Sequence, residues 1–242
     1  HLHQGYNLYN VGLSCGFFGL FAAALIRISG NSFESQLQWF EGDSLFLTLF
    51  VPVIAFIMIL SGLLLGKKRS LRSLVNIQKH SGRLPTDFID MESLEAAFIN
   101  SGLLGLAASL YIIVIGGDFS GPVIGSLFTV MGFGAFGTHL KNSWPVVSGV
   151  VVSSLIFGKS LSAPGPILAA VFSTTLAPLA GQFGVIAGFS AGFLHLVMVL
   201  NTGPWHGGMN LYNNGFAGGL TATLVVSFIQ WYQNNKTDQM PK

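Results

Sequence analysis

The sequence has few charged residues for its length. Asp, Glu, Lys and Arg make up 8% of the 242 residues, whereas apolar residues make up 51%. Soluble proteins carry about 25% charged residues, because a surface that faces water must be solvated. A run of 76 residues, 160–235, contains none of these four residue types. The sequence therefore argues strongly against a soluble protein.

Several chemical signatures are also missing. The chain has one cysteine, Cys15, so no disulfide framework can form. No His, Cys, Asp or Glu spacing is typical of a metal site, and no Ser or Cys nucleophile has an evident base. No basic and aromatic pattern indicates nucleic-acid binding. We therefore predict a protein that is not an enzyme, with no catalytic residues, no metal, no cofactor and no nucleic-acid partner.

The apolar stretches predict an all-α, polytopic transmembrane helix bundle. A helix needs about 20 apolar residues to cross about 30 Å of hydrocarbon. The sequence supports about 7–8 membrane segments of this kind, although 145–157 is short for a crossing. The expected segments are 8–29, 44–66, 96–117, 121–138, 145–157, 161–179, 183–202 and 215–232.

The charges that are present predict an orientation. Six of the eleven basic residues lie within residues 67–83, and cytoplasmic loops are enriched in Lys and Arg. We therefore expect a basic and then acidic cytoplasmic loop at 67–95, between a two-helix segment at 1–66 and a membrane domain at 96–235. The tail, 236–242, is polar.

Residues 160–180 contain Pro164, Gly165 and Pro166 in an apolar setting. Proline removes a backbone donor and kinks a helix. Irregular backbone at membrane depth survives only when it is buried in protein or lines a wet cavity. We expect a broken or re-entrant membrane segment here, or alternatively a loop at the membrane surface.

The strongest specific signal is an internal repeat. Residues 3–16 match residues 206–219 at eight of fourteen positions, without gaps, at a constant offset of 203. The simplest interpretation is that a homologous upstream unit, mostly absent from these 242 residues, precedes the first copy. Paired halves are a common plan in transporters. Whether the halves are parallel or inverted stays open.

Residues 210–219 and 162–170 carry a resemblance to a known family. The sequence around them is similar to a family of bacterial multi-spanning membrane proteins that is classed as a domain of unknown function. The resemblance covers about residues 90–235 and the first motif copy. It implies the bacterial cytoplasmic membrane and supplies no activity.

The candidate residues for a substrate path come mainly from the two motif copies. In each copy a His and two Asn fall at i, i+4 and i+7, one face of a helix if the segment is helical, with a Tyr beside them. These polar groups either contact a solute or hold the helices together. His195, in the middle of a span, and Asn100 are further candidates. The full set is His3, Asn7, Tyr9, Asn10, Asn100, Pro164, Gly165, Pro166, His195, His206, Asn210, Tyr212 and Asn213.

These features predict a transporter or channel for a small polar solute, with the lipid bilayer as the other partner. No carboxylate lies in an expected span, so a proton-coupled pump fits less well. A membrane-embedded enzyme that uses histidine, and a structural or sensory scaffold, are the alternatives. A homo-oligomer stays open.

Overall fold

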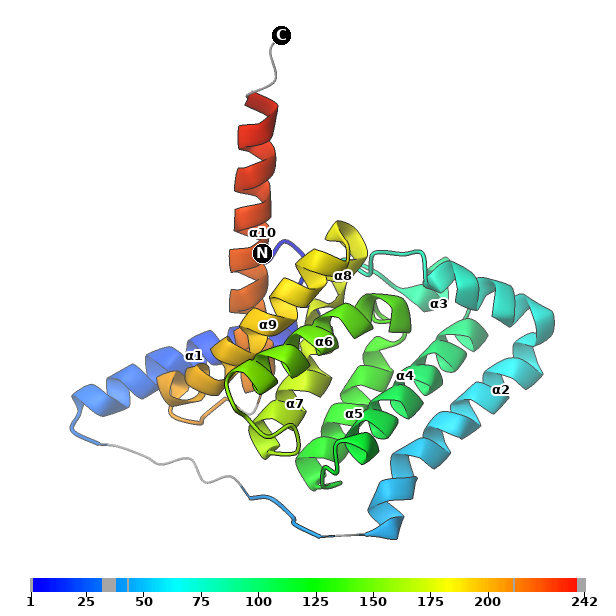
Figure 1. The fold of residues 1–242 in the computed structure, drawn as a ribbon, viewed down its shortest axis with the longest axis horizontal. Helices are drawn as coiled ribbons and strands as arrows, with labels where there is room; N and C mark the ends of the chain where they lie inside the picture. Colours follow the sequence, from blue (N-terminus) through cyan, green and yellow to red (C-terminus); the bar gives the residue numbers. More distant parts are fainter. Residues whose placement is uncertain (1, 32–37, 43, 211, 239–242) are drawn as a thin grey trace.

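The computed structural model describes residues 2–31, 38–42, 44–210 and 212–238 (Figure 1). All regular elements within these residues are helices, as the sequence predicts. In chain order they are α1 (Asn10–Ile28), α2 (Leu45–Ile77), α3 (Phe88–Met91), α4 (Leu94–Val114), α5 (Gly121–Phe133), α6 (Leu140–Ile156), α7 (Pro164–Phe172), the 3-10 helix η1 (Ser173–Leu176), α8 (Ala177–Phe183), α9 (Val185–Thr202), the 3-10 helix η2 (Gly203–His206) and α10 (Asn213–Asp238).

Within the described residues, five segments are long and apolar enough to cross a membrane. They are α1, α2, α4, the segment Pro164–Phe183 and the segment Val185–His206. The helices α5 and α6 have 13 and 17 residues, below the roughly 20 that a crossing needs. A helical protein with several apolar helices of spanning length is thus confirmed. The count of seven to eight stays a prediction.

The helix α2 lies at one edge of the molecule and packs against α4 (Figure 1). Its outer side exposes large apolar side chains such as Phe46, Phe56 and Leu64. Its inner side approaches α4 closely, because a Cβ on Gly102 would lie 2.5 Å from the carbonyl oxygen of Ala55. Close contact through small residues on one side and bare apolar surface on the other is typical of helices in lipid.

The predicted loop at 67–95 was wrong for its first part. The helix α2 continues to Ile77, with a kink at Lys67, where φ is 50° and ψ is −138°. The apolar residues Leu71, Leu74 and Ile77 follow the spacing of a helix face. Ile77 is buried beside Phe88, and Leu74 packs against the same cluster. Packing of Leu74 and Ile77 therefore stabilises helix where the density of basic charges indicated a loop, while Leu71 stays exposed.

The break in the segment near 160–180 lies further along the chain than the prolines indicated. Pro164 is the first residue of α7, where its missing N–H costs nothing. The regular helix is interrupted instead by η1, at Ser173–Leu176, before α8 continues. The alternative of a surface loop at 164–166 is also wrong, because Pro164–Phe172 is helical.

Candidate functional site

A turn held by a histidine precedes both α1 and α10. The backbone N–H of Asn7 donates to Nδ1 of His3 at 3.2 Å, and that of Asn210 donates to Nδ1 of His206 at 3.3 Å. All four residues are buried. The two motif copies therefore share a local structure as well as a sequence.

The turns differ from the predicted helical stripe. Gly5 and Gly208 hold the left-handed φ values of 86° and 75°, which favour glycine and interrupt a helix. Of the three predicted stripe positions in each copy, only the third, Asn10 or Asn213, belongs to α1 or α10. The condition for a single helix face is therefore not met, because glycine turns separate the histidines from the helices.

Each turn binds the helix of the other copy. The side-chain amide of Asn7 donates to the carbonyl oxygen of Gly215 in α10, at 3.4 Å. The amide of Asn210 donates to the carbonyl oxygen of Gly12 in α1, at 3.1 Å. Both asparagines thus hold the crossing of α1 and α10 near the start of each helix.

Glycine is required where the two helices touch. A Cβ on Gly12 would lie 2.8 Å from Cα of Gly215, and a Cβ on Gly215 would lie 2.9 Å from Cα of Gly12. The carbonyl oxygens of Tyr212 and Tyr9 would lie 2.8 Å from these same two positions. These neighbours are backbone atoms, so a side chain at either glycine would push the helices apart.

The 3-10 helix η1 covers the first turn. The N–H groups of Leu8 and Tyr9 donate to the carbonyl and hydroxyl oxygens of Thr175, both at 3.0 Å. The Thr175 hydroxyl donates in turn to Oδ1 of Asn7 at 2.6 Å. The hydroxyls of Tyr9 and Thr174 are 3.1 Å apart. The break between α7 and α8 therefore supplies the polar partners that the first motif copy needs.

A cavity of 340 Å³ lies at the crossing. Both motif copies contribute to its lining, together with α5 and α7. Its polar groups come from Asn10, Thr129, Tyr212 and Asn214, and its apolar walls include Phe133. The cavity is thus lined by neutral donors and acceptors on an apolar frame.

A second hollow of 520 Å³ adjoins the first. Leu8 and Asn10 border both hollows. The second one is otherwise lined by the connection after α2, including Thr86 and Asp87, and by Phe136. Asn10 therefore stands between the crossing and the surface that follows the basic end of α2.

His206 anchors the start of α10. Its Nδ1 accepts a backbone N–H, so Nε2 carries the proton and donates to Oδ1 of Asn213 at 2.9 Å. Thr202, at the end of α9, donates to the same oxygen at 2.8 Å. The Asn213 amide donates to the Val199 carbonyl oxygen at 3.0 Å. These contacts tie α9 to α10 across the turn. In the first copy, His3 hydrogen-bonds Asn10.

His195 lies one layer behind the cavity. Its Nε2 is 3.2 Å from Oδ1 of Asn214, and Asn214 lines the cavity. The other ring nitrogen, Nδ1, is buried and has no hydrogen-bond partner among the described residues. His195 therefore does not line the cavity itself but contacts Asn214, which does.

The remaining predicted residues lie elsewhere. The Asn100 amide donates to the carbonyl oxygens of Gly134 and Thr138, at 2.7 and 2.8 Å, and so holds the connection between α5 and α6. Residues 164–166 begin α7 and do not line the cavity.

Sequence reasoning missed four residues of the site. Thr129 and Asn214 line the cavity, and Thr174 and Thr175 bind the first turn. The threonine pair was detectable, because two adjacent hydroxyls within an apolar span need internal partners. Asn214 offered no such signal, because its counterpart in the first copy is Val11.

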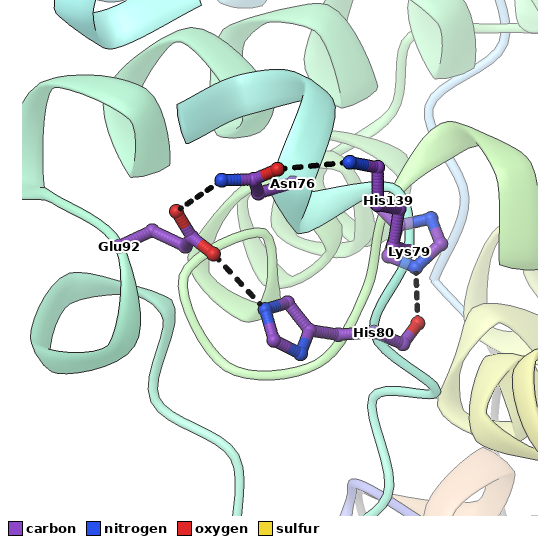
Figure 2. A network of polar contacts seen from close by, with 5 residues as sticks. All are labelled: Asn76, Lys79, His80, Glu92 and His139. Carbon is purple, nitrogen blue, oxygen red and sulfur yellow. Dashed lines mark hydrogen bonds and ion pairs between the residues drawn. The ribbon is translucent and has the colours of Figure 1, made fainter. Parts of the chain in front are cut away.

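A separate polar network joins the end of α2 to the starts of α4 and α6 (Figure 2). Glu92 accepts from Asn76 at 3.3 Å and pairs with His80 at 3.2 Å. His139 donates from Nε2 to the His80 carbonyl oxygen at 2.9 Å. Lys79 donates to Asn76 at 3.0 Å. Across the described residues, no three His, Cys, Asp or Glu side chains converge as metal ligands.

Within the described part of the chain, five apolar helical segments of spanning length and a crossing built on glycine are consistent with a helical membrane protein. A family model described as "Protein of unknown function (DUF1576)" matches residues 1–28 and 66–231, which is most of the chain. The chain therefore belongs to the DUF1576 family. No curated protein and no solved structure matches it significantly.

Proposed function

We propose that the protein is part of a membrane transporter or channel for a small polar solute, which passes the crossing of α1 and α10. The observation that carries this proposal is the position of Asn10. Its side chain borders both the 340 Å³ cavity and the adjoining 520 Å³ hollow. A residue between two adjoining hollows can contact a solute that moves from one to the other.

The chemistry of the lining supports an uncharged or singly charged solute. Amides and hydroxyls donate and accept hydrogen bonds without requiring a counter-charge. Asn10, Asn214, Tyr212 and Thr129 offer such groups at the crossing. The interrupted helix around η1 lies beside them, and transporters commonly use broken helices at their binding sites.

The family resemblance supports a membrane and the charges support an orientation. We place the protein in the bacterial cytoplasmic membrane, as the resemblance implies, with residues 67–95 on the cytoplasmic side, because the basic residues concentrate there. The bilayer then contacts the apolar outer sides of α1 and α2.

A pair of threonines offers a matched test. Thr129 lines the cavity and donates to the Gly125 carbonyl oxygen at 2.8 Å, whereas Thr223 makes the same 2.8 Å bond to Gly219 and lies outside the cavity lining. Loss of one hydrogen bond to the solute, about 1 kcal/mol, lowers flux about fivefold. We expect this loss for Thr129→Val and unchanged flux for Thr223→Val.

The measurement is uptake of glycerol, urea and glycine by liposomes that contain the full-length protein. Asn10→Leu serves as a second variant and should reduce flux at least as much as Thr129→Val. Equal flux in the two valine variants would argue against a path through the crossing. Uptake no faster than in empty liposomes, for all three solutes, would contradict transport of this solute class.

A further inference from the structure

The contacts between α1 and α10 are reciprocal. Asn7 donates to Gly215, and Asn210 donates to Gly12. The two donors are 203 residues apart, and so are the two acceptors, so the same bond forms in both directions across the crossing. The packing repeats the pattern, because Gly16 faces Phe216 while Gly219 faces Leu13. Such exchange, in which i contacts j′ while i′ contacts j, is the mark of a twofold axis.

The family match has the same periodicity. Its two matched segments end at residues 28 and 231, and these ends are also 203 residues apart. Together with the motif alignment at the same offset, this supports pairing residues 1–28 with the final part of the longer matched segment, which contains the second motif copy.

The surroundings of the two copies are not equivalent, although their mutual contacts are. Tyr9 is 8% exposed because η1 covers it, whereas its counterpart Tyr212 is 55% exposed. No element of the described residues takes the place beside Tyr212 that η1 takes beside Tyr9.

The two helices differ in the same way. On α10, Ala217, Gly218 and Thr221 are buried, and Thr221 is only 1% exposed. The counterparts on α1 are Ser14, Cys15 and Phe18, all exposed, with Phe18 at 76%.

The inner side of α10 is covered by η1 and α7. A Cβ on Gly218 would lie 2.7 Å from the Thr175 side chain of η1. Ala217 belongs to a buried cluster with Ala169 and Ala170 of α7. The break between α7 and α8 thus covers both the first turn and the inner side of α10.

We propose that Ser14, Cys15 and Phe18 of α1, together with Tyr212, form a docking surface for a second unit homologous to residues 94–206. The twofold relation places the η1 and α7 of that unit against this surface. In the matched segment 66–231 these helices precede the motif, so the docking unit is the part of the full-length polypeptide that precedes residues 1–28.

A second copy of this chain fits the surface less well. Its own Thr174 and Thr175 already bind Tyr9 and pack against Gly218. It could offer them to α1 only by releasing its own first turn. The docking surface is also suited to close helix contact, because Ser14 and Cys15 are small like their buried counterparts.

The docked unit would close the crossing on the side of Tyr212, which lines the 340 Å³ cavity. The cavity would then lie between two homologous halves. The docking itself does not depend on solute passage, so a failed uptake assay leaves it standing.

The test compares two positions on α1. Phe21 is 67% exposed, and its counterpart Leu224 remains 57% exposed, so Phe21 should face lipid in the complete protein. Phe18 should be covered. Nitroxide labels at Phe18→Cys and Phe21→Cys, in a full-length protein whose other cysteines are replaced by Ala, report oxygen collision rates in nanodiscs with one protein each.

We expect a collision rate several-fold lower at position 18 than at position 21. Equal rates would overturn the proposal. A second measurement needs no substitution, because Cys15 itself should react slowly with a lipid-soluble maleimide in the intact protein, and fast reaction would also overturn it. Shielding that appears in crowded membranes and is lost in single-protein nanodiscs would assign the surface to a second copy instead.

Discussion

Histidine serves this fold as a neutral acceptor at the start of helices. His3, His139 and His206 each accept a backbone N–H on Nδ1. The other nitrogen of His139 donates to the His80 carbonyl oxygen, and that of His206 donates to Asn213. Both ring nitrogens of His139 and His206 are then engaged in hydrogen bonds that hold the fold. A role for His206 in a solute path would require one of these bonds to break.

The His139 cap predicts a loss of stability in acid. Burial is the main cause that lowers the pKa of His139 from 6.5 to about 4; the hydrogen bond to the His80 carbonyl oxygen opposes this shift, and the charge of Lys141 adds to it. A proton on Nδ1 would also oppose the Asn142 N–H that it accepts. The unfolded chain binds this proton at higher pH than the folded chain, so folding is favoured fully above pH 6.5. We expect about 3 kcal/mol to be lost as the pH falls to about 4.

Melting temperatures in detergent, measured between pH 7 and 4, check this expectation. The control is His139→Asn, because Asn keeps a side-chain acceptor for the cap and does not titrate. Its melting temperature should fall less with acid than that of the parent. Parallel curves for the two proteins would show that His139 does not carry the pH dependence.

At the scale of elements, the crossing of α1 and α10 is the least tolerant contact. A methyl group on Gly215 would lie 2.8 Å from the Tyr9 carbonyl oxygen and 2.9 Å from Cα of Gly12. Backbone atoms cannot yield as flexible side chains do, and overpacking costs about 1–3 kcal/mol. We expect Gly215→Ala to lower the free energy of unfolding by about this amount, as thermal unfolding in detergent would measure.

Gly125 is the matched control for this substitution. It is also a helical glycine, in α5, and apart from its chain neighbours and the nearby backbone of α5, no atom of the described residues lies within 4 Å of its added Cβ. Gly125→Ala should stabilise the protein slightly, by about 0.5–1 kcal/mol, because alanine favours helix. If the two variants melt at the same temperature, the close approach at the crossing is not limiting.

Hydropathy predicted the positions of several helices well, whereas the charged residues led to one wrong prediction, at the end of α2. The expected spans at 8–29, 96–117 and 183–202 fall on α1, α4 and α9 within a few residues. An apolar run of about 20 residues is long enough to cross the hydrocarbon as a helix, so such runs indicate where helices lie. The end of α2 was missed because its Lys and Arg residues indicated a loop, although apolar residues at helix spacing continue to buried Ile77. The burial of Ile77 depends on its contact with Phe88, which lies beyond the end of α2 in the sequence.

The site was only half visible in the sequence. The repeat picked out residues 3–16 and 206–219, and the structure brings these two segments together. Their partners in η1 could not be ranked, because a threonine in an apolar span bonds its own helix as readily as a distant turn. Thr174 does both, since it also donates to the Val171 carbonyl oxygen.

At the scale of the whole molecule, α1 and α10 leave the crossing in different directions (Figure 1). Gln230 on α10 bonds Gln4, and the Gln4 carbonyl oxygen accepts from Arg83, so α10 runs along the side that carries the basic connection. Arg27 on α1 donates to the carbonyl oxygens of Pro204 and Trp205, beyond the end of α9.

The helix α9 separates these two sides. Its start follows Gly181, which packs against the backbone of Ser81 near the basic connection. Its 18 residues extend about 27 Å, so the end of α9, where Arg27 binds, lies at the opposite side. Arg27 near the end of α1 thus lies by one end of α9 and the later part of α10 by the other, an arrangement that favours an inverted repeat.

This geometry predicts opposite exposure for the segments that follow α1 and α10. Cysteines at Glu41 and Lys236, both exposed positions, should react with a membrane-impermeant maleimide from opposite sides of the membrane in a Cys15→Ala background. Because basic segments stay in the cytoplasm, Glu41→Cys should label in intact cells, and Lys236→Cys only after permeabilisation. Leu71→Cys, in the basic part of α2, is the cytoplasmic reference. Labelling of positions 41 and 236 from the same side would contradict the inverted arrangement and favour parallel halves.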